Sequence, residues 1–414
     1  MTTSTLVSLT PDWIDDFGHF GPFERRIHAV AEAAGYRHIA LAGTRLQPSA
    51  DWQLPAFSED TYSAGNGLEI VEGRFDRELR AALDFCRLGP GSVVFFYTAD
   101  VWHLEAILAV ATDHPGVRFV VNLMRSHGWI AKALENDPDP SINALVVRLI
   151  SCLIAASGTN VDVAVDTPAL ADDVELLTGH AVLLWPMIAL SEPSSPDVDR
   201  VRADGAIHIV APVHAQNAKG FPDLAALAER VTGALGRGEL RLTARSPAGS
   251  GVHPDILRLA ERFEEHGGQL VTPNMTDEGF AELIGSADVA LIPYRVRPFR
   301  TRTSGVTIDA LLAGKPVVAV RGTWAGDLVD RYGGGLTYTQ GNVDDMEAAL
   351  SGVISRLGAY RQRLGEMRAI IEGEHAPDRL IEFLGGRPVQ AAREPEAHAD
   401  SATSNASAGW TRPG

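Results

Sequence analysis

The sequence is poor in cysteine and in basic residues. It has only two cysteines among 414 residues, Cys86 and Cys152, and both lie inside apolar patterns of helical period. Buried free thiols are therefore favoured over a disulfide or a metal pair, and we expect a reducing, cytoplasmic environment. The sequence has 36 basic and 53 acidic residues, which gives a formal net charge of -17. Because such a surface repels phosphate backbones and anionic lipid, no nucleic-acid partner is expected, and a phosphorylated ligand needs a local basic pocket.

Segments that direct a chain to or across a membrane are also missing. The polar start, Met1 to Ser4, lacks the basic and apolar regions of a signal peptide. The most apolar stretch, 142–156, is interrupted by Asn143 and Arg148 and is shorter than the ~20 residues that cross a bilayer. We therefore expect a buried helix there and no transmembrane segment.

The sequence has no recognisable metal site or nucleophile motif. It contains no zinc-type Cys/His spacing, no Gly-x-Ser-x-Gly elbow and no phosphate loop ending in Gly-Lys-Ser/Thr. Two Asp-x-Asp pairs, Asp137/Asp139 and Asp197/Asp199, lie beside prolines or in a linker, where turn and capping roles are favoured. We expect no metal and no cofactor.

What the first half does contain is an alternation of short apolar runs and amphipathic helical segments. Runs rich in Val, Ile, Leu and Phe are typical of parallel strands, and segments such as 23–34 and 77–86 have helical period between them. This pattern predicts one doubly wound, Rossmann-like domain over residues 1–190. The expected strands are 5–9, 38–42, 92–97, 117–122, 161–165 and 181–185.

The alternation stops at a linker and then restarts. Residues 191–205 carry Pro193, Pro196 and several aspartates, which indicates an exposed connection. A second Rossmann-like domain is predicted over 206–345, then helices over 346–386 and a disordered tail over 387–414. Two such α/β domains predict a central cleft at the carboxyl ends of both sheets. The expected strands of the second domain are 206–211, 240–244, 269–271, 289–293, 316–320 and 335–338.

The most informative segment lies around the predicted strand 289–293 and the helix that follows it. Thr303, Ser304 and Gly305 stand where this helix begins, so its free backbone N–H groups and dipole favour an anion such as a diphosphate. Arg300 and Arg302 lie immediately upstream, where they could neutralise charge on a leaving group. An ordinary capped helix with solvated arginines explains the same residues.

This segment resembles that of the retaining glycosyltransferases with the two-Rossmann (GT-B) fold, of the group-one, family-four-like, nucleotide-sugar type. Members carry two acidic residues separated by seven others, followed by a small-residue turn and Pro-Val-Val. The second acidic position falls on Asp309, for which the resemblance implies hydrogen bonds to the donor ribose. The first falls on Thr301, which is not acidic, and this departure leaves both the donor sugar and the retaining outcome open.

A second match to the same family covers the predicted strand that begins the second domain. The stretch 207–220 ends in Lys219-Gly220 and resembles the family's strand and loop ending in Lys-Gly, where an Arg and a Lys grip the diphosphate. Lys219 falls on the lysine position, and His214 falls on the arginine position. A histidine donates to phosphate when protonated, which makes that contact pH-dependent. Arg245, at the end of the next strand, is a further basic candidate, and a solvated surface lysine remains the alternative for Lys219.

Two candidate sites lie in the first domain. Gly18 and His19 sit in a glycine-containing turn between the first strand and the first helix, where the backbone can approach a ligand. The resemblance places donor phosphate and acceptor contacts there, and an acceptor-side histidine after the fourth strand, at His127. A loop histidine that caps the next helix is the alternative for His127.

The resemblance implies transfer of a sugar from a nucleotide diphosphate donor to a small-molecule or saccharide acceptor, and the missing metal motifs predict that no metal takes part. His127, Lys219 and Arg302 are the expected catalytic residues. A nucleotide-sugar epimerase, a coupling enzyme or a non-catalytic scaffold on the same fold remain the alternatives. The donor base and sugar, the acceptor and the oligomeric state stay open.

Overall fold

The computed structural model describes two compact units. Unit 1 comprises Met1–Leu190, Thr301–Thr303 and Ala376–Val389, and unit 2 comprises Ser191–Arg300, Ser304–His375 and Gln390–Gly414. The described residues are 4–15, 20–58, 74–99, 101–123, 152, 154–156, 160–189, 205–247 and 252–386.

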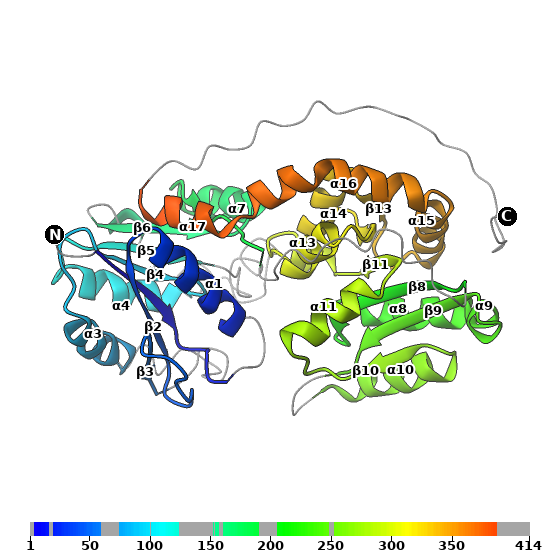
Figure 1. Cartoon of the computed structure of the whole chain (residues 1–414), viewed down its shortest axis with the longest axis horizontal. Coiled ribbons are helices and arrows are strands. Elements are labelled where there is room, and N and C mark those ends of the chain that lie inside the picture. The colour runs from blue at the N-terminus through cyan, green and yellow to red at the C-terminus, as the bar shows by residue number, and fades with distance from the viewer. Residues whose placement is uncertain are drawn as a thin grey trace. The chain divides into compact units, whose positions relative to one another are not determined.

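Unit 1 is built on a seven-stranded parallel sheet with the order β3-β2-β1-β4-β5-β6-β7 (Figure 1). The central strands are buried along almost their whole length, as expected for a parallel sheet covered on both faces. The strands are β1 (Thr5–Thr10), β2 (Arg37–Gly43), β3 (Gln53–Phe57), β4 (Val93–Phe96), β5 (Arg118–Asn122), β6 (Val161–Val165) and β7 (Leu183–Leu184).

Two sets of helices cover the faces of this sheet. One core cluster joins the sheet to α3, α4 and α7, and a second joins the other face to α1 and α17. Helix α17 therefore belongs to unit 1 although it follows the whole of the second sheet in sequence. The helices are α1 (Phe20–Ala33), α3 (Arg74–Cys86), α4 (Val101–Ala111), α7 (Pro168–Thr178) and α17 (Pro377–Leu384).

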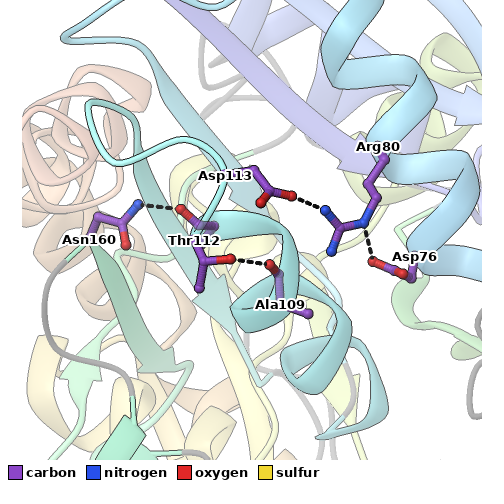
Figure 2. Close-up of polar contacts among 7 residues, drawn as sticks. Asp76, Arg80, Ala109, Thr112, Asp113 and Asn160 are labelled. Atoms are coloured by element: carbon purple, nitrogen blue, oxygen red, sulfur yellow. Dashed lines mark hydrogen bonds and ion pairs between the residues drawn. The ribbon is translucent and has the colours of Figure 1, made fainter.

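Polar contacts fix α3 and α4 against each other (Figure 2). Arg80 of α3 binds Asp76 of the same helix at 3.0 Å and also Asp113, which follows α4. Asn160 donates to the carbonyls of Ala111, His114 and Val117 at 3.0–3.1 Å, so it satisfies backbone acceptors where α4 ends. These contacts are structural and lie away from the carboxyl end of the sheet.

Unit 2 repeats the architecture with a six-stranded parallel sheet of order β10-β9-β8-β11-β12-β13. In both units the first strand lies at the centre and the chain then winds outward in both directions, which is the Rossmann arrangement. The strands are β8 (Ile207–His214), β9 (Leu240–Arg245), β10 (Gln269–Val271), β11 (Val289–Ile292), β12 (Val317–Val320) and β13 (Gly335–Tyr338).

Most helices of unit 2 begin at a side chain that caps them. Thr276, Ser304, Thr323 and Asn342 each accept a backbone N–H from the first turn of the helix that follows. The helices are α8 (Phe221–Arg230), α9 (Thr232–Gly236), α10 (Pro254–Glu265), α11 (Asp277–Gly285), α12 (Val296–Phe299), α13 (Gly305–Leu312), α14 (Trp324–Tyr332), α15 (Val343–Ser355) and α16 (Leu357–Glu374).

The predicted strands are present, with two differences in unit 1. Strand β3 was not expected, because Gln53–Phe57 is short and contains Pro55, which cannot donate to a neighbouring strand. The structure accommodates that proline because β3 lies at the edge of the sheet. The strand expected over 181–185 is reduced to Leu183–Leu184. The α/β fold class with two Rossmann-like domains is confirmed.

Candidate functional site

The carboxyl edge of the second sheet carries two of the predicted donor-binding residues and a tyrosine. His214 ends β8, Arg245 ends β9, and Tyr294 lies two residues after β11. The chain changes winding direction between β8 and β11, and ligands of open α/β sheets bind at such a switch point. Three neighbouring strand ends therefore present polar side chains at the edge where a nucleotide is expected.

Lys219 is held at this edge by the turn after β8. Gly220 has a φ of +73° and immediately precedes α8, and an added Cβ would overlap the carbonyl oxygen of Pro293. Only glycine fits there, for reasons of both conformation and space. The N–H of Arg295 also donates to the carbonyl of Ala218 at 3.0 Å, so the turn is fastened to the segment after β11. The half-buried Lys219 acts electrostatically on His214.

His214 and Arg245 converge on one backbone carbonyl. Nε2 of His214 lies 3.0 Å from the oxygen of Pro273, and the guanidinium of Arg245 donates to the same oxygen. The two residues are register partners across β8 and β9, after a bulge between Ala211 and His214. The Arg245 guanidinium also lies over the ring of Phe280, 5.5 Å from its centroid.

Burial governs the protonation of this pair. Burial, followed by the nearby cations Arg245 and Lys219, lowers the pKa of His214 to about 4, while the hydrogen bond with the Pro273 carbonyl opposes them. Burial also lowers the pKa of Arg245, although the guanidinium stays charged at neutral pH. His214 is therefore neutral at pH 7, and the positive charge at this edge comes from Arg245 and Lys219.

The start of α13 is fixed by a chain of hydroxyl groups. Ser304 Oγ donates to the Tyr294 hydroxyl at 3.3 Å and accepts from the N–H and the hydroxyl of Thr307, at 3.4 and 3.0 Å. These three contacts use the whole hydrogen-bonding capacity of a serine hydroxyl. The Tyr294 ring stacks on Phe299 with centroids 3.8 Å apart, and burial raises the pKa of Tyr294 to about 12. The Ser304 side chain thus orients the helix start, and the backbone N–H groups remain as its means of binding an anion.

The other residues predicted near α13 divide between the two units. Arg300, exposed, follows α12, and Asp309 is buried within α13. Arg302 groups with unit 1, and its Nε is buried without a hydrogen-bond partner among the described residues. Burial lowers the pKa of Arg302. Thr301, at the first acidic position of the family pattern, is buried as well.

Unit 1 carries a second polar cluster at the carboxyl edge of its own sheet. Asn122 ends β5 and donates to the Tyr97 carbonyl at 2.9 Å and to Asp166, just after β6, at 2.7 Å. The other Asp166 oxygen accepts a hydrogen bond from the Thr303 hydroxyl at 3.2 Å. Thr303 also belongs to unit 1. Burial raises the pKa of Asp166 to about 7, against the opposing effects of the Asn122 and Thr303 hydrogen bonds.

Three predicted residues of the first domain lie outside the described residues: Gly18, His19 and His127. Sequence reasoning did not select Asn122, Asp166 or Tyr294. Each of them ends or closely follows a correctly predicted parallel strand. A polar residue in that position was the signal that could have identified all three, because the carboxyl ends of parallel strands share one edge.

Two features are absent from the described part of the chain. Among those residues, no group of three or more His, Cys, Asp or Glu side chains is arranged to hold a metal ion. No helix in the same ranges is both long enough and apolar enough to span a membrane.

Comparison with known proteins finds similarity in structure alone. No family model and no curated protein matches the sequence. Sucrose-phosphate synthase from Thermosynechococcus elongatus matches with a TM-score of 0.69 at 12% identity, covering 92% of this chain and 99% of that one. A UDP-forming trehalose-phosphate synthase from Burkholderia xenovorans matches with a TM-score of 0.65 at 14% identity, covering 92% and 98%. WaaG, a glycosyltransferase of lipopolysaccharide biosynthesis, matches with a TM-score of 0.63 at 13% identity, covering 92% and 100%.

The likeness extends over most of each chain and includes both units. Identities of 12–14% establish a shared fold and leave activity to be argued from the site. These three neighbours are glycosyltransferases of the GT-B fold, and this chain shares that fold.

Proposed function

We propose that this chain is a metal-independent glycosyltransferase that transfers a sugar from a nucleotide diphosphate donor to a small-molecule or saccharide acceptor. The observation that carries the proposal is that Lys219, Arg245 and the start of α13 follow the neighbouring strands β8, β9 and β11 at the switch point of the second sheet, with both cations acting on His214. Two cations and a set of free amides match the charge and shape of a diphosphate.

The chemistry assigned to these residues is stabilisation of the leaving group. When the bond between the sugar and the diphosphate breaks, negative charge accumulates on the departing phosphate oxygen. Lys219, Arg245 and the N–H groups at the start of α13 are preorganised to accept that charge. We assign the buried carboxylate of Asp309 to hydrogen bonds with the donor ribose hydroxyls. The support for this role is that Asp309 falls on the second acidic position of the family pattern.

The neighbours support the donor class and the stereochemistry. One is described as bound with UDP-2-fluoro glucose, and another as an example of glycosyl transfer with retention. We extend both properties to this chain as part of the proposal.

A donor screen on the purified protein tests the proposal. Nucleotide sugars are incubated with the protein and a panel of acceptors in EDTA, and products are identified by mass spectrometry and by NMR of the anomeric centre. We expect acceptor-dependent release of nucleoside diphosphate, with at least one donor, that survives removal of divalent metal. Conversion of donor without acceptor would indicate an epimerase instead.

The Lys219→Ala variant tests the role assigned to Lys219 in stabilising the leaving group. Loss of a charge contact to the leaving group costs ~10²-fold or more in turnover. Lys315→Ala is the control, because the buried Lys315 ammonium donates to the Gly285 carbonyl at 2.8 Å, a contact within the fold. Unchanged turnover in Lys219→Ala would remove this residue from the proposed mechanism.

A further inference from the structure

Two side chains of unit 2 approach the same backbone carbonyl, that of Pro273. The chemistry of this oxygen limits the protonation state that one of them can adopt. His214 and Arg245 both approach this oxygen, from the ends of neighbouring strands. A carbonyl oxygen accepts hydrogen bonds and cannot donate them. Nε2 of His214 therefore carries a hydrogen, and the free position on the ring of the neutral imidazole is Nδ1, an acceptor.

This tautomer alters the part that His214 can play. A neutral ring with its N–H committed to Pro273 has no donor to offer a phosphate oxygen. Two cations act on His214 and oppose its protonation: Arg245 from β9 and Lys219 from the turn after β8. Adding a third positive charge among them is unfavourable, and burial of the ring adds to the cost.

Arg245 keeps unused donor capacity at the same place. Its Nε is buried and has no hydrogen-bond partner among the described residues. A buried, unsatisfied N–H is costly, and in native proteins such groups commonly await a ligand or an ordered water. The contacts with Pro273 and Phe280 hold the guanidinium in one orientation, so its remaining donors have a fixed direction.

We propose that His214 is a neutral positioning residue that holds the Pro273 carbonyl by a hydrogen bond. This carbonyl orients the Arg245 guanidinium, which binds the donor diphosphate together with Lys219. Arg245 is the register partner on β9 of His214, the residue of β8 that falls on the arginine position of the family pattern. The diphosphate part of this inference rests on the proposed function, whereas the state of His214 does not.

The state of His214 is tested by NMR of protein labelled with ¹⁵N-histidine. The His214→Gln spectrum assigns the signal. We expect His214 to remain in the Nε2–H form, without titrating, from pH 5.5 to 8. A His214 signal that becomes doubly protonated within this range, or that shows the Nδ1–H form, overturns the inference whether or not the protein binds nucleotide.

The role of Arg245 is tested by calorimetric titration with UDP, GDP and ADP in EDTA. We expect Arg245→Gln to weaken binding of the preferred nucleotide at least ten-fold, and His214→Phe, which removes the donor but keeps a ring, to weaken it about five- to ten-fold. His214→Gln restores an N–H for Pro273 and should bind within about three-fold of the wild type. Both side chains act through one carbonyl, so their effects should not be independent. The double variant His214→Phe/Arg245→Gln should therefore weaken nucleotide binding by less than the product of the two single-variant factors.

The pH profile separates positioning from direct phosphate binding. With His214 neutral, the affinity of the wild type should be the same at pH 6 and pH 8 after correction for titration of the nucleotide itself. A rise in affinity at pH 6 that disappears in His214→Gln would show a protonated His214 on phosphate and overturn the inference. If the wild type binds none of the nucleotides, the proposed function and the diphosphate role of Arg245 both fail, while the NMR result still decides the state of His214.

Discussion

Gly220 fixes the position of Lys219 because no larger residue fits between the turn and Pro293. Its φ of +73° lies in the region that favours glycine, and the site has no room for a Cβ. The lysine can therefore be placed by backbone geometry before any ligand arrives. Preorganisation of this kind is what electrostatic stabilisation of a leaving group requires.

Gly220→Ala should lower the free energy of unfolding by several kcal/mol. Gly238→Ala is the matched control, since Gly238 has nearly the same φ of +70° but no atom within 4 Å of an added Cβ. The free energy of unfolding of the control should fall by only about 1–2 kcal/mol, the cost of placing a non-glycine residue in the left-handed conformation. Urea denaturation of the two variants measures the difference, and equal losses would contradict the close packing of Gly220 on Pro293.

Helix α17 is an element of unit 1 despite its place in the sequence. Four of its residues enter the core cluster formed with α1, and the Phe383 ring lies 5.7 Å from that of Trp185. Arg118 of β5 donates to the carbonyls of Phe383 and Leu384, so it satisfies the end of the helix. The last helix thus completes the first domain.

Leu380→Ala should destabilise unit 1 by about 2–5 kcal/mol, because Leu380 is fully buried. Leu176→Ala in α7 of the same unit is the control, as Leu176 is 76% exposed and its loss should lower the free energy of unfolding by less than about 1 kcal/mol. Urea unfolding followed by tryptophan fluorescence reports both, since Trp185 lies beside α17. Similar midpoints for the two variants would exclude this packing of α17.

A buried polar network joins α1 to the first two strands. Glu24 accepts from Ser8 at 2.6 Å and from Thr10 at 2.5 Å, and His38 Nε2 lies 3.5 Å from its carboxyl group. Burial raises the pKa of Glu24 to about 7, although the two hydroxyls lower it. Burial, followed by the effect of His28, lowers the pKa of His38 to about 3. The network is therefore neutral near pH 6.

These shifts make opposite contributions to stability. A raised carboxyl pKa means that the folded state holds its proton more tightly, so the Glu24 contribution is present below pH 4.5 and is lost as the pH rises to about 7. The lowered pKa of His38 gives stability above pH 6.5 that is lost as the pH falls towards 3. Glu24→Gln isolates the first contribution because it cannot ionise.

Relative to the wild type, Glu24→Gln should gain stability as the pH rises from 4.5 to 7.5, by an amount on the order of 2 kcal/mol. Urea midpoints at half-unit pH intervals measure this, with Trp13 and Trp52, 5.8 Å apart in the same cluster, as fluorescent reporters. A difference between the two proteins that does not change with pH would show that Glu24 ionises normally in the fold.

The elements could be predicted because strands and helices here carry strong local patterns. The strands 161–165, 269–271 and 335–338 were bounded correctly, since apolar runs with flanking turn residues leave little ambiguity. The assignment of α17 to unit 1 could not be predicted, because nothing in residues 377–384 distinguishes one core from another. The roles of His214 and Ser304 depend on Pro273 and Tyr294, contacts that exist only after folding.

At the scale of the whole molecule, an acidic chain carries a basic site. The net charge of -17 repels polyanions in general, so the cations at the carboxyl edge of unit 2 must act locally on a ligand that reaches them. Two Rossmann-like units offer two such edges. We assign the nucleotide to the edge of unit 2, where Lys219, Arg245 and the start of α13 follow neighbouring strands.

Hydrogen–deuterium exchange with the preferred nucleoside diphosphate, in EDTA, tests this assignment most directly. Peptides that cover 215–220 and 304–307 should exchange more slowly when nucleotide is bound, and Lys219→Ala should show weaker protection at the same nucleotide concentration. Peptides that cover the strand ends of unit 1, such as 97–99, serve as the internal comparison. Binding that protects only unit 1 and leaves 215–220 and 304–307 unchanged would contradict the account.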